Sequence, residues 1–241
     1  MNLKQNDIEL TLKNGDLLRK KKFLKLLHID FYEILLKQAP KNIDGLIVEL
    51  GSGAGFLKEI EPKVLTSDIL DISGVDKVFS AEKIPFKNSS VRSFVGLNIL
   101  HHIKDPIKAF SEMERCLKVG GTICFIEPSN TIWSKFIYKN FHHEFFDEKA
   151  EWKNTKKRAL FDSNIALPWI IFNRDINKFN KLFSKLKIKS IHIHTPFTYL
   201  ISGGLSKFQF LPTYMYGFVR KIDNILTRQG MFMTIIITKS K

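Results

Sequence analysis

The sequence has only two cysteines, Cys116 and Cys124, among its 241 residues. They form neither a metal-binding pattern nor a disulfide framework, so we expect a reducing, cytoplasmic setting. No apolar run approaches the ~20 residues of a membrane-spanning helix, and no signal peptide opens the chain, because Lys20–Lys22 interrupt the first apolar cluster. An apolar fraction of 44% with 21 Phe predicts one globular domain over residues 1–241.

Arginine is also scarce, because only seven of the 38 basic residues are Arg, although the net charge is +14. Arg is the residue that binds phosphates bidentately, and most lysines are scattered outside the clusters Arg19–Lys25 and Lys153–Arg158. The composition therefore does not favour nucleic acid as the partner. Residues 1–15 are polar, so we expect them to be loosely packed, whereas apolar spacing predicts a helix over Asp16–Ala39. This helix either packs on a sheet or touches an anionic membrane surface at the inner membrane face.

The strongest local signal is a short apolar run that ends in glycines. Residues 46–50 predict a buried strand, and Gly51, Gly53 and Gly55 follow it. Glycines allow backbone N–H groups to approach a ligand where a Cβ would obstruct it. A dinucleotide-binding motif would place its third glycine at position 56, which is Phe56. This difference counts against an NAD(P)-dependent oxidoreductase, which stays an alternative.

An acidic residue ends each of the first two predicted strands. Glu49 lies near the end of the first strand, and Asp68 follows the second strand, Val64–Ser67. This spacing is close to the ~20 residues expected between a nucleotide-binding loop and the acid that holds ribose hydroxyls. A carboxylate can accept a hydrogen bond from both hydroxyls of the diol, which favours this role for Asp68.

Four segments together resemble a known family. They are E-L-G-S-G-A-G (49–55), S-A-E-K-I-P-F (80–86), L-N-I-L-H-H-I-K-D-P (97–106) and L-K-V-G-G (117–121). In this order they are similar to the class I S-adenosylmethionine (SAM)-dependent methyltransferases, in particular the type 11 methyltransferase domain. The resemblance implies an α/β, Rossmann-like fold, with a seven-stranded sheet in the order 3-2-1-4-5-7-6. It also implies an antiparallel last strand, helices on both faces and a lid formed by insertions.

The resemblance further implies SAM as the cofactor. The glycines would line its amino-acid end, Asp68 its ribose and Ser80–Glu82 its adenine. Relatives usually carry Asp at position 80, so the Ser80 hydroxyl or the Ala81 backbone would take over the adenine contact. The expected cofactor-binding residues are Glu49, Gly51, Gly53, Gly55, Asp68, Ile69, Ser80, Ala81, Glu82 and Asn98.

Candidate catalytic residues follow the fourth and fifth predicted strands, Ser93–Asn98 and Thr122–Ile126. Imidazole accepts protons near neutral pH, so we expect His102 and His101, with Glu127, to remove the proton of the group that receives the methyl. A structural role for the histidine pair stays open. The further candidates are His142, His143 and Glu144. Adjacent histidines point apart and no fourth ligand is evident, so we expect no metal site there.

Beyond Pro128 the family resemblance weakens. We expect residues 46–128 to form the SAM-binding core, and residues 129–170 and 196–230 to form two acceptor-side insertions that meet over the cofactor. Predicted helices cover residues 131–141, 174–186 and 214–226, and predicted strands cover residues 77–79, 187–194 and 231–238.

The insertions are rich in aromatic residues, which suits a small-molecule or lipid- or glycan-linked acceptor, with a hydroxyl favoured as the methylated group. Nucleic-acid N-methyltransferases of this fold would carry Asn/Asp-Pro-Pro-aromatic where residues 97–100 read L-N-I-L. A SAM-fold protein that binds without catalysis is the second alternative. The aromatic residues concerned are Trp133, Phe136, Tyr138, Phe141, Phe145, Phe146, Trp169, Phe208, Phe210, Tyr214, Tyr216 and Phe218.

Overall fold

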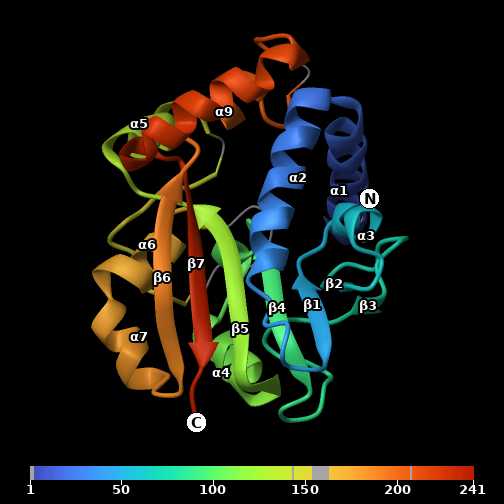
Figure 1. Cartoon of the computed structure of the whole chain (residues 1–241), viewed down its shortest axis with the longest axis vertical. Helices are drawn as coiled ribbons and strands as arrows, with labels where there is room; N and C mark the ends of the chain where they lie inside the picture. Colours follow the sequence, from blue (N-terminus) through green and yellow to red (C-terminus); the bar gives the residue numbers. More distant parts are fainter. Residues whose placement is uncertain (1–2, 143, 154–162, 207) are drawn as a thin grey trace.

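The chain folds around one seven-stranded sheet in the order β3-β2-β1-β4-β5-β7-β6 (Figure 1), which confirms the predicted topology. This computed structural model describes residues 3–142, 144–153, 163–206 and 208–241, so His143 and residues 154–158 of the second basic cluster lie outside it. β7 runs antiparallel to β5 and β6, and the other paired strands are parallel. The strands are β1 (Leu46–Leu50), β2 (Leu65–Asp68), β3 (Lys77–Val78), β4 (Val91–Leu97), β5 (Leu117–Pro128), β6 (Leu186–His194) and β7 (Phe232–Lys239).

Helices cover both faces of the sheet, and each face has its own apolar core. On one face α2 buries Leu24, Leu27 and Phe31 against β4, β5 and β7. On the other face Phe110 of α4 and Phe179 of α7 pack with the inner side chains of the same strands. The helices of the described chain are α1 (Leu3–Lys20), α2 (Lys22–Lys37), α3 (Phe56–Ile60), η1 (Leu100–His102), α4 (Pro106–Cys116), α5 (Ile132–Phe141), α6 (Leu167–Trp169), η2 (Ile170–Arg174), α7 (Ile176–Leu182), α8 (Thr198–Ser202), η3 (Thr213–Met215), α9 (Tyr216–Ile225) and η4 (Thr227–Gln229).

The N-terminal segment differs from the prediction. Residues 1–15 were expected to be loosely packed and residues 16–39 to form one helix, but α1 starts at Leu3 and the chain breaks at Lys21 before α2. α1 packs on the glycine loop through small groups: a Cβ at Gly15 would lie 2.2 Å from the Cβ of Ala54. Arg19 adds a 2.7 Å hydrogen bond to the Ala54 carbonyl oxygen. Contacts through glycine and arginine leave no apolar stripe in the sequence, which is why the periodicity missed this helix.

Two segments near the C-terminal half meet at the end of the sheet toward which β5 points (Figure 1). The Trp133 indole on α5 donates to the Pro196 carbonyl oxygen at 3.0 Å and lies 5.8 Å from the Phe197 ring. The predicted helices over 131–141 and 214–226 are confirmed as α5 and α9, whereas the helix predicted over 174–186 ends earlier, at Leu182. That these segments form an acceptor-side lid stays a prediction. Among the described residues, none of the helices is long and apolar enough to cross a membrane.

Candidate functional site

The glycine loop leaves β1 in the middle of the sheet, at the carboxyl ends of the parallel strands. Gly51, Gly53 and Gly55 have φ values of +67°, +53° and +72°, which L side chains rarely adopt. Ser52 and Ser67 fix the loop to β2, since the Ser52 N–H donates to the Ser67 carbonyl oxygen at 2.9 Å and the Ser67 N–H donates to the Ser52 hydroxyl at 3.0 Å. The loop is therefore rigidly held beside the neighbouring strand end.

Two buried acceptor atoms beside this loop have no hydrogen-bond partner among the described residues. They are Glu49 Oε2, on a side chain that is 1% exposed, and Asn98 Oδ1, at the end of β4. Burial raises the pKa of Glu49 to about 7, although hydrogen bonds from Ser52 and Tyr32 oppose this shift. Unsatisfied buried acceptors are rare in native proteins, and a ligand that donates hydrogen bonds would satisfy them. The ammonium group at the amino-acid end of SAM is a donor of this kind.

Asp68 ends β2 next to the same loop. Its Oδ2 accepts from the Gly53 N–H and its Oδ1 from the Leu70 N–H, both at 2.9 Å, so each oxygen keeps a lone pair for a further donor. Burial raises the pKa of Asp68 above its ordinary value, and these backbone hydrogen bonds partly offset that. Ile69 beside it is 53% exposed. The structure thus places Asp68 next to the glycines, as the ribose role requires.

The predicted adenine segment has internal contacts of its own. The Ser80 hydroxyl accepts from the Glu82 N–H at 3.2 Å. Glu82 in turn accepts from the Asp105 N–H at 3.1 Å, and Asp105 caps α4 by accepting from the Lys108 N–H. Glu82 therefore joins this segment to the start of α4, and its contact with adenine stays a prediction.

The position of α1 over the glycine loop was not predicted from the sequence. The Thr11 methyl group lies 3.5 Å from the position of a Cβ at Gly53, and Ile99 closely approaches Gly51 from the other side. Tyr32 of α2, which contacts Glu49, was missed as well. These contacts join residues distant in the sequence, and no local pattern signals them.

A second polar cluster lies at the carboxyl ends of β4 and β5. Glu127 is fully buried and accepts from the Ile99 and Leu100 N–H groups and from His101 Nδ1, each at 2.7 Å. On the other side of the ring, His101 Nε2 lies 3.5 Å from Glu144 Oε2. His102 Nε2 lies 3.9 Å from Glu144 Oε1. The structure thus brings the predicted catalytic residues His101, His102 and Glu127 together with Glu144, one of the further candidates.

The two carboxylates decide the charge of His101. Burial alone would lower the pKa of His101, but Glu127 and then Glu144 raise it to about 9. Burial opposes ionisation of Glu144, yet His101 and the nearby His102 lower the pKa of Glu144 to about 2. At neutral pH His101 is therefore a cation between two carboxylates, and a cationic imidazole cannot accept a proton.

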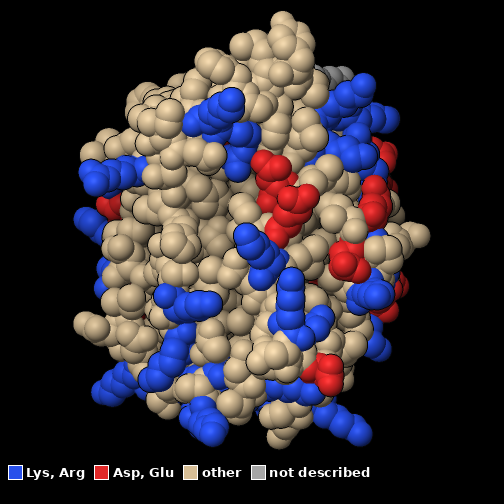
Figure 2. All heavy atoms as spheres, viewed as in Figure 1, with Lys and Arg blue, Asp and Glu red and all other residues tan. Residues whose placement is uncertain are grey.

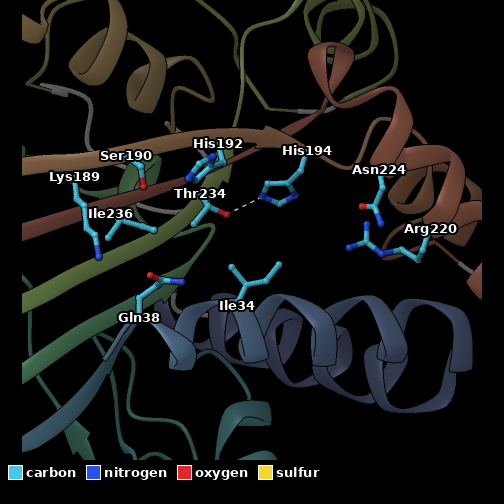
Figure 3. Close-up of a pocket in the computed structure, with 10 residues that line it drawn as sticks. All are labelled: Ile34, Gln38, Lys189, Ser190, His192, His194, Arg220, Asn224, Thr234 and Ile236. Carbon is cyan, nitrogen blue, oxygen red and sulfur yellow. Dashed lines mark hydrogen bonds between the residues drawn. The ribbon is translucent and has the colours of Figure 1, made fainter. Parts of the chain in front are cut away.

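A separate pocket of about 440 Å³ lies on the face of the sheet covered by α2, with none of the predicted site residues in its lining. Figure 3 shows it between α2, α9 and strands β6 and β7, where His194 Nε2 and the Thr234 hydroxyl are 2.8 Å apart. Its lining includes Gln38, Lys189, His192, Arg220, Asn224 and Thr234. Arg220 is already paired with Asp30 and Asp223, so the pocket offers less positive charge than its composition suggests.

Comparisons with known proteins agree with this geometry. The family model described as "Methyltransferase domain" matches residues 17–125. The curated 2-methyl-6-phytyl-1,4-hydroquinone methyltransferase of Spinacia oleracea (chloroplastic) is 25% identical in an alignment of 162 residues. The match covers 54% of this chain and 46% of that relative. The chain thus spans about half the length of that relative.

Solved structures share the fold. A SAM-dependent methyltransferase from Thermotoga maritima superposes with a TM-score of 0.60 at 13% identity, over 99% of this chain and all of that chain (100%). A geranyl diphosphate methyltransferase in complex with SAM gives a TM-score of 0.53 at 16% identity, over 94% of this chain and 90% of that chain.

The sheet order, the antiparallel last strand and the glycine loop with Asp68 define the fold of the class I SAM-dependent methyltransferases. Dinucleotide oxidoreductases of the Rossmann type have a parallel sheet without this antiparallel strand. Residues 17–125 match the family model of a methyltransferase domain, and the whole chain has the fold of the SAM-dependent methyltransferases.

Proposed function

We propose that this protein transfers the methyl group of SAM to a hydroxyl group of a small-molecule acceptor that carries an extended apolar part. The observation that carries the proposal is that the unsatisfied acceptors of Glu49 and Asn98 and the His101–Glu127 cluster lie at the carboxyl ends of the adjacent strands β1, β4 and β5. The sulfonium of SAM supplies the electrophilic methyl group. Because the transfer is an in-line displacement, the protein mainly positions the two reactants and excludes water.

The chain's own residues have distinct roles in this proposal. Glu49 and Asn98 hold the ammonium group, and Asp68 holds the ribose hydroxyls. His102, which is 20% exposed, receives the acceptor's proton, since His101 is held as a cation by Glu127 and Glu144.

The proposed acceptor class follows from an exposed apolar surface, which we call the aromatic rim. Its members are Phe208 (75% exposed), Phe210 (72%), Tyr214 (86%) and Phe218 (60%). In Figure 2 the upper end of the molecule, where Figure 1 shows α9 and the segment before it, is largely uncharged and has Lys and Arg beside it. Exposed apolar patches with a polar border mark interaction sites.

Lysines border the aromatic rim. Lys21 donates to the carbonyl oxygens of Gly204, Ser206 and Phe208 at 2.6–2.9 Å, which holds the segment of Phe208 next to the junction of α1 and α2. Lys20 and Lys22 on either side of it are exposed. Two lysines near an anionic lipid surface contribute about 1 kcal/mol each.

We therefore infer that the aromatic rim meets an anionic membrane, from which the acceptor is taken. Two of the five basic residues within Arg19–Lys25 are engaged internally: Arg19 with Glu59, and Lys21 with the carbonyl oxygens. The basic helix thus contributes less to membrane contact than its sequence suggests, and the aromatic side chains contribute more. A prenylated hydroquinone acceptor, named for the relative from Spinacia oleracea, belongs to the same chemical class.

Sedimentation with neutral and anionic vesicles, at low and moderate salt, tests this proposal. The wild-type protein should pellet with anionic vesicles. The double variant Phe208→Ser/Phe210→Ser should bind at least tenfold more weakly, because each ring contributes about 2 kcal/mol when it leaves water. Val119→Ser is the control, since Val119 is also an exposed apolar side chain (49%). It lies near the start of β5, at the end of that strand opposite to the aromatic rim. A wild-type protein that stays in the supernatant with both vesicles would rule out the membrane, and a soluble acceptor would replace it.

A further inference from the structure

Two histidines that are adjacent in the sequence direct their Nε2 atoms to one carboxylate. His101 Nε2 and His102 Nε2 lie 3.5 Å and 3.9 Å from the two oxygens of Glu144. Side chains of neighbouring residues usually diverge, but the η1 turn places these two rings 4.2 Å apart, centroid to centroid, with 40° between their planes. One ligand atom from each of the three residues lies within 4.8 Å of the other two.

The backbone holds Glu144 in this position. The Asn164 N–H donates to the His101 carbonyl oxygen at 3.4 Å, and the Ile165 N–H donates to the Phe145 carbonyl oxygen at 3.0 Å. The segment at Asn164 thus joins η1 to the residue that follows Glu144. The convergence is therefore built by the main chain as well as by attraction between the side chains.

Glu127 fixes the orientation of the first imidazole. It uses both oxygens for three short hydrogen bonds, one of them to His101 Nδ1, so it is not available as a further ligand. Because the Nδ1 proton is donated to Glu127, a bound ion would displace the proton of Nε2, and Nε2, directed toward Glu144, is then the ligand atom. A carboxylate behind a histidine in this way is the usual arrangement around metal-binding histidines, where it sets the tautomer and raises the basicity of the ligand.

We propose that His101, His102 and Glu144 bind a divalent transition-metal ion such as Zn²⁺, with Glu127 as the orienting carboxylate. Two imidazole nitrogens and one carboxylate are the ligand types that Zn²⁺ and its neighbours prefer, whereas Mg²⁺ and Ca²⁺ prefer oxygen ligands throughout. An ion held by three protein ligands keeps at least one position for water or an oxygen atom of the acceptor. With the ion bound, the ion would promote loss of the acceptor's proton in place of His102. His102 and Glu144, with side chains 20% and 14% exposed, lie on the accessible side.

The distances are compatible with such an ion. Ligand atoms around tetrahedral zinc lie about 3.4 Å apart, for zinc–nitrogen bonds of about 2.1 Å. The 3.5 Å separation of His101 Nε2 and Glu144 Oε2 already has this value. The widest separation, up to 4.8 Å, closes by rotation of the partly exposed His102 and Glu144 side chains.

The sequence analysis predicted no metal at the H-H-E segment His142–Glu144, because adjacent histidines point apart and no fourth ligand was evident. The structure instead places Glu144 beside a histidine pair that lies 42 residues earlier in the chain (144 minus 102). His143 lies outside the described residues and has no part in the proposal.

Cobalt titration of the chelator-treated full chain tests the site without methyl donor or acceptor, so its outcome is independent of the proposed function. Co²⁺ replaces Zn²⁺ in such sites and gives visible absorption bands in a four- or five-coordinate geometry. The wild-type protein should bind one Co²⁺ per chain, with the bands bleached by one equivalent of Zn²⁺. Zn²⁺ should also raise the melting temperature of the wild-type protein, since an ion that binds only the folded state stabilises it.

Variants separate this site from other surface histidines. Glu144→Gln and His102→Asn should each lose at least tenfold in Co²⁺ affinity, and Glu127→Gln should lose about 10–100-fold, as expected for an orienting partner. His192→Asn is the control, because His192 is exposed on β6 and outside the cluster. Absence of the bands and of the thermal shift in the wild-type protein would overturn the proposal. Equal affinity in Glu144→Gln and wild type, or loss of binding in His192→Asn, would do so too.

Discussion

Replacement of Glu49 by glutamine should remove a pH dependence from SAM binding. In the cofactor-free protein the pKa of Glu49 is about 7, raised by burial. If the cationic amino-acid end of SAM binds the ionised carboxyl, the apparent Kd contains the factor 1 + 10^(pKa − pH). This factor falls about tenfold between pH 6 and pH 8. The wild-type protein should therefore lose about tenfold in SAM affinity from pH 8 to pH 6, relative to Glu49→Gln.

Isothermal titration calorimetry with SAM at pH 6, 7 and 8 measures this difference. The amino group of SAM titrates in the same way with both proteins, so the ratio of the two Kd values isolates Glu49. At pH 8 the variant should bind about tenfold or more weakly, because hydrogen bonds to charged groups contribute about 1.5–3 kcal/mol. Glu33→Gln, on the exposed side of α2, is the control and should behave as wild type. A ratio that stays constant with pH would show that Glu49 does not contact the charged end of the cofactor.

Three further predictions concern the cofactor site and its surroundings. Asp68→Ala should bind SAM on the order of tenfold to a hundredfold more weakly by calorimetry, and unchanged affinity would mean that the ribose is held elsewhere. Gly15→Ala should lower the melting temperature and the SAM affinity, because its Cβ would lie 2.2 Å from that of Ala54. Gly217→Ala is the control and should not destabilise the protein, because nothing lies within 4 Å of its added Cβ. Equal effects of the two variants would refute the packing of α1 on the glycine loop. Burial lowers the pKa of His28 to about 4 from 6.5, so its contribution to stability is complete above pH 6.5 and is lost as pH falls toward 4. As pH falls, the wild-type protein should lose up to about 3 kcal/mol of unfolding free energy, measured with urea, that His28→Gln does not lose. Identical pH profiles of the two proteins would contradict this.

The core of the fold follows from local signals in the sequence. The apolar run 46–50, the three glycines and the acid at Asp68 are close together in the chain, so their geometry depends mainly on neighbours. The same holds for the Asp105-Pro106 start of α4, whose cap is confirmed. Such elements could be predicted, together with the strand order that the family resemblance implied.

The rest depends on contacts between distant segments. Glu144 meets His101 and His102 only because the chain returns along Asn164, and no spacing rule connects residues so far apart. α1 was missed because it packs through Gly15 and Arg19 instead of an apolar stripe. The cationic state of His101 also needs two carboxylates from separate elements, so the sequence could not distinguish it from His102 as a base.

Incubation of the purified protein with methyl-labelled SAM and separate lipid and aqueous cell extracts tests the central claim most directly. Mass spectrometry should find the label in a lipid-soluble product, in step with the formation of S-adenosylhomocysteine. Asp68→Ala should reduce both signals on the order of tenfold to a hundredfold at SAM concentrations below the wild-type Kd, and Glu33→Gln should retain them. Label confined to the aqueous fraction would overturn the proposed acceptor class. SAM binding without label in either extract and without S-adenosylhomocysteine would contradict methyl transfer itself and favour a protein that binds without catalysis.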